Sequence, residues 1–273
     1  MDIKAFKMDG LGNDFVIIDQ RSQNYNLTKD QIIKICDRNF IGCDQLIFIQ
    51  KSNEKDAGLE FYNSDGSISG ACGNGTRCVA DLLSKENNDK EIILWTTSGA
   101  LKSQILGNNS VETEIGIAKT NWNEIPLNKN LDTKNLNIKI VNKNNIEHIG
   151  GTSVNVGNPH IVFFVDNIED YDLKKIGPEI ENHNYFPEKC NVTLAKVISK
   201  KLIKVKVWER GAGLTKACGT AACATAVAAN INGLIDKKTD IEFALGRLSI
   251  TIDQDNSIHM KGPVSDITNI EIN

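Results

Sequence analysis

The tripeptide Ala-Cys-Gly occurs twice, around Cys72 and Cys218, and each copy begins a run of small residues with helical character. A second pair of similar segments precedes the two tripeptides at almost the same distance. Gly12 lies 60 residues before Cys72, within Leu-Gly-Asn-Asp-Phe-Val, and Gly157 lies 61 residues before Cys218, within Val-Gly-Asn-Pro-His-Ile. Self-similarity over so long a period indicates a duplication, and copies of about 145 residues have the size of domains. The chain is therefore expected to form two related domains with one of these cysteines in each.

Both cysteines stand where a loop passes into a predicted helix, Thr76–Lys85 after the first and Ala221–Asn230 after the second. A thiol at a helix N-terminus experiences the partial positive charge of unpaired backbone N–H groups, which favours the thiolate. Glycines after each cysteine allow backbone amides to approach a ligand closely. We expect a substrate carboxylate to be held by the amides of Gly73, Asn74, Gly219 and Thr220. Such a site could bind an acid and deprotonate it.

Two reactive cysteines from two related domains suggest a particular chemistry. A single one would fit a thioester or redox enzyme. Inversion of a stereocentre needs a base on one face of a carbon and an acid on the other face. Two domains that close on a substrate can supply this arrangement. We therefore expect Cys72 and Cys218 to act as a pair, one as thiolate and the other as thiol.

The other cysteines fit a structural role. The chain has seven, an odd number, and no secretion signal, so reduced thiols are expected in place of a disulfide framework. Their close spacings are not the Cys-x-x-Cys pairs of zinc sites, and only four histidines are present, so we expect no metal. Cysteine without a reactive role is among the most buried residue types. This prediction of burial covers Cys36, Cys43, Cys78, Cys190 and Cys223.

Composition excludes several classes of partner. The net charge is -4, and the lysines are scattered between acids, so nucleic acid is not an expected partner. The N-terminus lacks the features of a signal peptide and no stretch approaches 18 apolar residues, so we expect a cytoplasmic protein with no membrane partner. There is no P-loop and no Gly-x-Gly-x-x-Gly turn after a strand, which leaves no sign of a bound cofactor.

Short apolar segments predict strands in both halves, and three segments predict helices. Thr28 begins a capping box that opens a helix through Cys36, and an alanine-rich helix covers Cys218–Ile231. The polar segment Lys119–Lys134 is the predicted linker. Strands are predicted at Phe15–Asp19, Gln45–Gln50, Leu59–Tyr62, Glu91–Thr97, Leu101–Leu106, Val111–Ile117, Ser153–Val156, His160–Val165, Asn191–Val197, Leu202–Trp208, Ile241–Ala244 and Leu248–Asp253.

The two cysteine motifs also carry a family resemblance. Cys-Gly-Asn-Gly-x-Arg-Cys at Cys72–Cys78 resembles the first signature of the diaminopimelate epimerases, and Glu-Arg-Gly-Ala-Gly from Glu209, followed by Ala-Cys-Gly-Thr, resembles the second. Further matches at Gly10–Phe15, Gly157–His160 and Gly262–Pro263 extend the agreement over nearly the whole chain, in order.

The resemblance implies an α/β fold (α+β type) of two pseudo-symmetric domains. Each domain is expected to be a strongly curved, mostly antiparallel sheet around a central helix, with the active site in the cleft between the domains. In this fold, residues 1–117 and 263–273 form the N-terminal domain, which carries Cys72. Residues 118–262 form the C-terminal domain, which carries Cys218.

The activity implied by the resemblance is epimerisation of LL-2,6-diaminopimelate to the meso form without pyridoxal phosphate, in lysine and peptidoglycan precursor biosynthesis. Cys72 and Cys218 would exchange acid and base roles with the direction of reaction. His160 and Glu209 match family residues that tune the thiol pKa values: a charged imidazole would lower a thiol pKa, and a carboxylate would favour the protonated thiol. The family is also commonly a homodimer.

Substrate binding follows the same resemblance. Diaminopimelate carries two amino acid head groups, so its distal end needs donors for a carboxylate and acceptors for an ammonium group. Arg210 offers a bidentate fork, and asparagine side chains both donate and accept. The expected substrate-binding residues are Asn13, Gln45, Asn63, Gly73, Asn74, Asn158, Asn191, Glu209, Arg210, Gly219 and Thr220.

Three positions depart from the family pattern, and two other functions stay open. Ala71 stands where glutamine is common, Leu214 where glutamate is common and Ala221 where glycine is common; none removes a group with an assigned chemical role.

One alternative function is that of a proline or hydroxyproline racemase, although those enzymes typically have histidine at the position of Asn74. The other is a non-catalytic amino-acid-binding or thiol-redox protein, in which oxidation could join Cys72 and Cys218.

Overall fold

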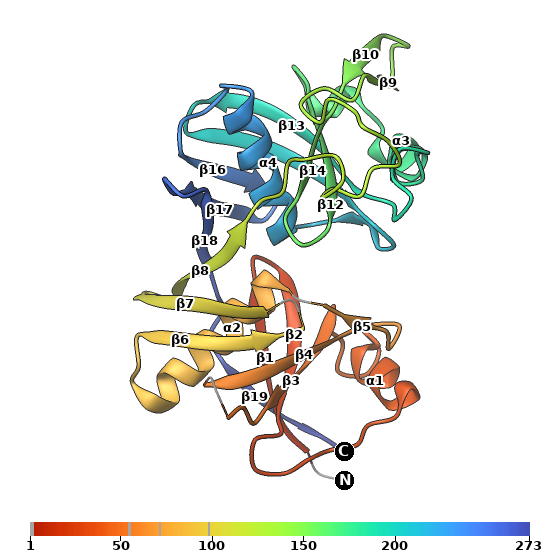
Figure 1. The fold of residues 1–273 in the computed structure, drawn as a ribbon. Coiled ribbons are helices and arrows are strands. Elements are labelled where there is room, and N and C mark those ends of the chain that lie inside the picture. The colour runs from red at the N-terminus through yellow and green to blue at the C-terminus, as the bar shows by residue number, and fades with distance from the viewer. Residues whose placement is uncertain (1–2, 54–55, 71, 98) are drawn as a thin grey trace. The chain divides into compact units, whose positions relative to one another are not determined.

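The computed structural model describes residues 3–53, 56–70, 72–97 and 99–273. The chain divides into two compact units (Figure 1). Unit 1 comprises Met1–Glu114 and Lys261–Asn273, and unit 2 comprises Ile115–Met260. The chain therefore begins in unit 1, passes through the whole of unit 2, and ends in unit 1.

Unit 1 is a mixed sheet with two helices. Antiparallel pairs join β1 to both β2 and β19, β3 to β4, β4 to β5, β6 to β7 and β7 to β8. Only β2–β3 and β4–β6 are parallel among the pairs described within this unit. The elements are β1 (Ile3–Gly10), β2 (Asn13–Asp19), α1 (Lys29–Cys36), β3 (Gln45–Gln50), β4 (Ala57–Asn63), β5 (Ile68–Ser69), α2 (Gly73–Asn87), β6 (Glu91–Thr96), β7 (Gly99–Gly107), β8 (Ser110–Ile117) and β19 (Thr268–Ile272).

Unit 2 follows the same path. The pair β11–β12 is antiparallel, β12–β13 is parallel, β13–β14 and β14–β15 are antiparallel, β14–β16 is parallel and β16–β17 is antiparallel. A separate hairpin, β9–β10, precedes this sheet. The elements are β9 (Ile138–Val141), β10 (Glu147–Gly150), β11 (Thr152–Asn155), β12 (Pro159–Phe164), a 3-10 helix (Ile168–Asp170), α3 (Leu173–Glu181), β13 (Asn191–Ser199), β14 (Leu202–Glu209), β15 (Gly213–Thr215), α4 (Gly219–Ile231), β16 (Lys238–Phe243), β17 (Gly246–Ile252) and β18 (Ser257–Pro263).

The predicted duplication and fold class are confirmed by this shared topology. In each unit a hairpin is followed by a helix, an antiparallel set of three strands, a second helix, and a further strand that pairs in parallel with the middle strand of the set. β1 to β7 of unit 1 therefore correspond to β11 to β17 of unit 2. The helices α1 and α3 correspond, as do α2 and α4.

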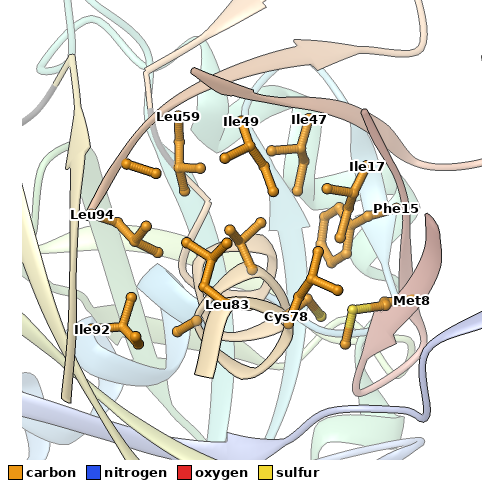
Figure 2. Packing of buried hydrophobic residues seen from close by; sticks show 14 of the residues in the cluster. Met8, Phe15, Ile17, Ile47, Ile49, Leu59, Cys78, Leu83, Ile92 and Leu94 are labelled. Atoms are coloured by element: carbon orange, nitrogen blue, oxygen red, sulfur yellow. The ribbon is translucent and has the colours of Figure 1, made fainter. Parts of the chain in front are cut away.

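The central part of the helix that follows each cysteine motif is buried on every side. All ten residues of α2 from Asn74 to Leu83 are buried, as are all nine of α4 from Ala221 to Ala229. A helix without a solvent face is surrounded by its own domain. Figure 2 shows Cys78 and Leu83 of α2 among apolar side chains from the surrounding strands, including Phe15 and Ile47.

Two predictions about chain organisation need correction or addition. The predicted linker Lys119–Lys134 belongs to unit 2: Lys119 bridges to Asn155, and Ile125 and Leu127 are buried in a core cluster. It has irregular backbone but is packed, because a few apolar side chains anchor it. The predicted strands and helices are confirmed with shifts of a few residues at their ends, while β1, β5, β9, β10, α3, β15, β18 and β19 were not predicted.

Candidate active site

The two motif cysteines occupy the same position in their units. Cys72 is the N-cap of α2, with φ -141° and ψ 110°, and Cys218 is the N-cap of α4, with φ -141° and ψ 116°. The helix starts predicted from the glycine-rich motifs are therefore confirmed, except that Ala71 lies outside the described residues. At both positions the first-turn N–H groups lack helical partners and carry the positive end of the helix dipole.

In unit 1, polar side chains surround Cys72. The Oδ1 atom of Asn13 lies 3.7 Å from Cys72 Sγ and accepts a hydrogen bond of 3.2 Å from Asn74 Nδ2. On its other side, Asn13 Nδ2 donates to Asp44 Oδ2 at 3.0 Å. Arg77 Nη2 donates to Asn74 Oδ1 at 2.8 Å. The structure thus brings Asn13, Asn74 and the thiol together, as the sequence predicts, with a carbonyl oxygen facing the sulfur.

Gln45 and Asn63 form a second polar pair in unit 1. They lie opposite each other in register at the ends of β3 and β4, and Gln45 Nε2 donates to Asn63 Oδ1 at 2.9 Å. Asn63 in turn donates to Ser67 Oγ at 3.0 Å. The Oε1 atom of Gln45 is buried and has no hydrogen-bond partner among the described residues. A buried acceptor without a partner is costly, so this oxygen is available for a ligand donor such as an ammonium group.

Sequence reasoning missed the charged residues that support Asn13. Arg38 donates to Asp14 through both terminal nitrogens, at 2.6 and 2.8 Å, and to Asp44 at 2.6 Å. Burial raises the pKa of Asp14, but the hydrogen bonds and charge of Arg38 outweigh burial and hold that pKa below its ordinary value. The available signal was position, because Asp14 directly follows Asn13 and Asp44 directly precedes Gln45.

In unit 2, Cys218 is buried and lies in the field of a carboxylate. The backbone N–H of Ala221 donates to Cys218 Sγ at 3.4 Å, and Thr220 Oγ1 lies 3.4 Å from the same sulfur. These contacts favour the thiolate, but burial and the charge of Glu209 have the larger effect and raise the pKa of Cys218 well above its ordinary value. Cys218 is therefore a protonated thiol at neutral pH.

The environment of His160 differs from the one considered from the sequence. Its ring is buried, and burial together with the charge of Arg210 lowers the pKa of His160 to about 3. The imidazole is consequently neutral at neutral pH, so in this form it does not supply the positive charge that would lower a thiol pKa. Its Nε2 lies 2.8 Å from Asn158 Oδ1, while Nδ1 is buried without a partner within the described parts of the chain.

Asn191 and Glu209 lie on two adjacent strands of unit 2, and Arg210 directly follows the second strand. Asn191 begins β13 and Glu209 ends β14, and the neighbouring pair Val192–Trp208 sets them opposite each other. Asn191 Oδ1 accepts from the backbone N–H of Arg210 at 2.9 Å, and Arg210 Nη1 donates to the carbonyl of Glu188 at 2.8 Å.

Strand register relates these residues to those of unit 1. Gln45 pairs in parallel with Phe15 of β2, and Asn191 pairs in parallel with His160 of β12, so Gln45 and Asn191 correspond. Asn63 lies opposite Gln45 and Glu209 lies opposite Asn191, so these two residues correspond as well. Both Asn63 and Glu209 stand nine residues before the motif cysteine of their unit. Each unit thus presents the same constellation: a helix N-terminus with a thiol, and a polar pair at two neighbouring strand ends.

The constellation can perform acid–base chemistry on an amino acid. The helix-start amides suit a carboxylate, the polar pairs suit ammonium and carboxylate groups, and the thiols can exchange protons. Within the described ranges, no group of three or more His, Cys, Asp or Glu side chains is placed to hold a metal ion. In the same ranges, no helix has the length and apolar character needed to span a membrane.

Comparison with known proteins identifies the family. The family model for diaminopimelate epimerase matches residues 5–120 and 152–267. The chain is 78% identical over 272 residues to a diaminopimelate epimerase of Pelagibacter ubique (strain HTCC1062), covering 100% of this chain and 99% of that protein. It is 43% identical over 260 residues to a diaminopimelate epimerase of Phenylobacterium zucineum (strain HLK1), covering 95% and 94% of the two chains.

Solved structures of more distant proteins share the fold. A phenazine biosynthesis protein of the PhzF family from Bacillus anthracis superposes with a TM-score of 0.69 at 15% identity, covering 100% of this chain and 99% of that one. A hydroxyproline epimerase from Agrobacterium vitis superposes with a TM-score of 0.66 at 12% identity, covering 100% and 92%. At such low identity these likenesses show the fold alone. The sequence matches over nearly the full length go further: this chain belongs to the diaminopimelate epimerase family.

Proposed function

We propose that this isomerase converts LL-2,6-diaminopimelate to meso-diaminopimelate by transferring protons at the α carbon between the substrate and two cysteines, Cys72 and Cys218. The observation that carries the proposal is the repeated geometry, in which each unit places one thiol at the N-terminus of a buried helix with nearly identical backbone angles. Family membership supplies the substrate and the place of the reaction in lysine and peptidoglycan precursor biosynthesis.

The chemistry follows from having two thiols of unequal character. One cysteine, as thiolate, takes the α proton from one face of the carbon, and the electron pair left behind is delocalised into the adjacent carboxylate. The other cysteine, as thiol, delivers its proton to the opposite face, which inverts the stereocentre. Cys218 enters this cycle as the acid, because burial and Glu209 keep it protonated. Cys72 is then the first base, and the two exchange roles for the reverse reaction.

The proposed binding residues divide into two groups by function. The first-turn amides of the two helices hold the reacting carboxylate, where the helix dipoles also stabilise the charge that develops during proton removal. The polar residues recognise the two amino acid head groups, with Gln45 Oε1 as an acceptor for an ammonium group and Arg210 as the fork for a carboxylate. This second group comprises Asn13, Gln45, Asn63, Asn158, Asn191, Glu209 and Arg210.

The test is incubation of the purified protein with LL-diaminopimelate in deuterium oxide without added cofactor. We expect meso product with deuterium at the inverted α carbon, detected by mass spectrometry and chiral chromatography. Cys72→Ala and Cys218→Ala should each lower kcat by about a hundredfold to ten-thousandfold, because general acid–base catalysis by one group contributes about 10²–10⁴. Cys223→Ala is the matched control, since Cys223 is a buried thiol of the same helix, α4, and should leave turnover nearly unchanged.

Two outcomes would contradict the proposal. Full epimerase activity in either motif-cysteine variant would rule out the two-thiol mechanism. Rapid racemisation of free proline, with no action on diaminopimelate, would instead favour a proline racemase activity.

We further propose a cytoplasmic homodimer whose protomers each hold one substrate. The proposal rests on family resemblance alone. Sedimentation velocity at micromolar concentration tests it, with a species of twice the 30.1 kDa chain mass as the expected result. A single species of chain mass would reject the dimer.

A further inference from the structure

A buried carboxylate outside the predicted site anchors the turn that carries Glu209 and Arg210. Glu181 is the last residue of α3 and is only 6% exposed. Its two oxygens accept from two different places: Oε2 accepts from the indole N–H of Trp208 at 2.7 Å, and Oε1 accepts from the backbone N–H of Gly211 at 3.1 Å. Lys189 Nζ lies 4.0 Å from Oε1 and contributes a weaker charge contact.

The two hydrogen bonds of Glu181 hold the turn on both sides of Glu209 and Arg210. Trp208 directly precedes Glu209, and Gly211 directly follows Arg210. The N–H of Arg210 itself donates to Asn191 Oδ1 at 2.9 Å, so two consecutive backbone N–H groups are fixed by side chains. Gly211 adopts a φ of +76°, a left-handed conformation that leaves the turn little alternative path while its N–H stays bonded.

The other partner of the carboxylate is itself held in place by α3. A Cβ atom added to Gly177 would lie 2.6 Å from the ring of Trp208, which means that the indole lies flat against the helix backbone at this glycine. The ring therefore has a fixed position, and its N–H points to Glu181 one turn further along the same helix. α3 thus forms a rigid platform from which one carboxylate reaches the turn.

We propose that Glu181 is a positioning residue for the reaction: it holds the turn 209–211 so that Arg210 meets the substrate carboxylate and Glu209 faces Cys218. This inference rests on the proposed function for the role of Arg210, but the anchoring of Glu209 against Cys218 does not depend on the substrate. Among the described residues, the Glu181 side chain accepts hydrogen bonds from the Trp208 indole and from the backbone of Gly211, neither of which is a predicted binding residue. We infer that Glu181 acts on the site through the backbone of the turn.

The substitution Glu181→Gln isolates this role. A glutamine side chain has one oxygen acceptor and one NH₂ donor, so it can satisfy either Trp208 or Gly211 but must turn a donor toward the other. Glu179→Gln is the matched control, because it is the same change on an exposed face of the same helix. Trp208→Phe keeps an aromatic ring beside Gly177 and leaves the hydrogen bond to Gly211 in place, but it removes the indole donor and part of the ring volume.

Steady-state kinetics and the titration of Cys218 provide the readouts. We expect Glu181→Gln to raise KM for diaminopimelate about tenfold, the size expected for losing one charge-assisted hydrogen bond, with a smaller change in kcat. The pKa of Cys218 should fall in this variant, because Glu209 moves away from the sulfur. This pKa is measured from the thiolate absorbance as a function of pH, after subtracting the absorbance of the same protein carrying Cys218→Ala. Glu179→Gln should leave both unchanged, and Trp208→Phe should change KM less than Glu181→Gln.

The outcomes separate a positioning role from a merely structural one. A folded Glu181→Gln protein with wild-type KM and an unshifted Cys218 titration would overturn the inference. If Glu181→Gln fails to fold, Trp208→Phe and Gly211→Ala carry the test, and unchanged values in both would overturn it equally. If the wild-type protein does not act on diaminopimelate, the proposed function fails, whereas the Cys218 titration still decides whether Glu181 positions Glu209.

Discussion

At the scale of single residues, the two motif cysteines share a backbone geometry and differ in their surroundings. Cys72 is half-buried beside the amide of Asn13, whereas Cys218 is buried and faces the charge of Glu209. The helix N-terminus favours thiolate at both positions, but at Cys218 burial and the charge of Glu209 outweigh this effect and raise its pKa.

The buried imidazole of His160 predicts a loss of stability in acid. Its pKa is about 3 in the folded chain and near 6.5 when exposed, so below pH 6.5 the unfolded chain binds a proton that the folded chain does not. The neutral imidazole of His160 therefore adds its full contribution to the unfolding free energy above pH 6.5, and this contribution is lost as the pH falls toward 3. Between pH 7 and about pH 4.5, we expect this residue to account for about 2–3 kcal/mol of the decrease in unfolding free energy.

The His160→Gln variant provides the comparison, since glutamine does not titrate. Urea unfolding of both proteins at the two pH values should give a steeper decrease for the wild type. Equal pH dependence in the two proteins would mean that His160 is protonated in the folded chain after all.

The sequence predicted most polar residues of the site but not the charges behind them. Asn13 and Asn158 were found because they repeat in matched segments, and Glu209 and Arg210 because they lie in a recognisable motif. Asp44 and Glu181 lie in no repeated segment and in no recognisable motif. A carboxylate in an unaligned sequence is usually a solvated surface group, and only strand register and helix packing bring these two against the site.

At the scale of elements, the first turns of α2 and α4 differ at one informative position. Gly75 and Ala221 each lie three residues after the motif cysteine. A Cβ on Gly75 would lie 2.7 Å from Ile47 Cδ1 and 3.0 Å from Phe61, so this glycine is required by close packing of α2 on the sheet. In α4 the methyl group of Ala221 is fully buried and accommodated. The packing around α4 therefore accommodates the alanine at position 221.

Exchanging these two residues should destabilise the protein for opposite reasons. Gly75→Ala improves helix propensity but overpacks the core, and we expect a cost of about 1–3 kcal/mol in unfolding free energy. Ala221→Gly removes a buried methyl and adds backbone freedom, with an expected cost of about 1–2 kcal/mol. Chemical denaturation of both variants measures this, and a Gly75→Ala protein more stable than wild type would show that the strands yield to the added methyl.

Elements with a strong local signal were predicted, and those determined by tertiary packing were not. The capping box of Thr28 and Gln31 marked α1 correctly, with both of its hydrogen bonds present. α3 was missed because Pro178 lies inside it, although its apolar face packs into the unit 2 core. The segment 119–134 was misinterpreted as a linker, because its few buried apolar residues are not spaced with the period of a helix or of a strand.

At the scale of the whole molecule, duplication has preserved the path of the chain while allowing the two sites to diverge. Strand order and parallel pairing are the same in both units, yet an uncharged pair in unit 1, Gln45 and Asn63, corresponds to Asn191 and Glu209 in unit 2. Unit 2 therefore has a carboxylate at a position where unit 1 has a neutral amide, and this charge, together with burial, raises the pKa of Cys218. The duplication could be predicted because it fixes spacing along the sequence, whereas this difference in charge has meaning only once register pairs the residues.

The return of the chain to unit 1 through β19 predicts that the two units lose stability separately. β19 pairs with β1, and Ile272 is buried in a cluster with Ile3 and Ile32 that lies wholly within unit 1. Ile272→Ala should therefore cost about 2–4 kcal/mol, as expected for truncating a buried isoleucine. Hydrogen–deuterium exchange read by mass spectrometry should show faster exchange in peptides of β1 and α1, while peptides of β13 and α4 keep their wild-type rates.

Glu271→Ala is the matched control, because Glu271 is exposed on the opposite face of the same strand and should change the unfolding free energy by less than about 0.5 kcal/mol. The decisive comparison is between units in the Ile272→Ala protein. If peptides of unit 2 exchanged faster by the same factor as those of unit 1, the molecule would open as one cooperative body, and a defect at the C-terminal strand would reach both thiols at once. Confinement to unit 1 would instead leave the Cys218 titration unchanged while the helix that begins after Cys72 loosens.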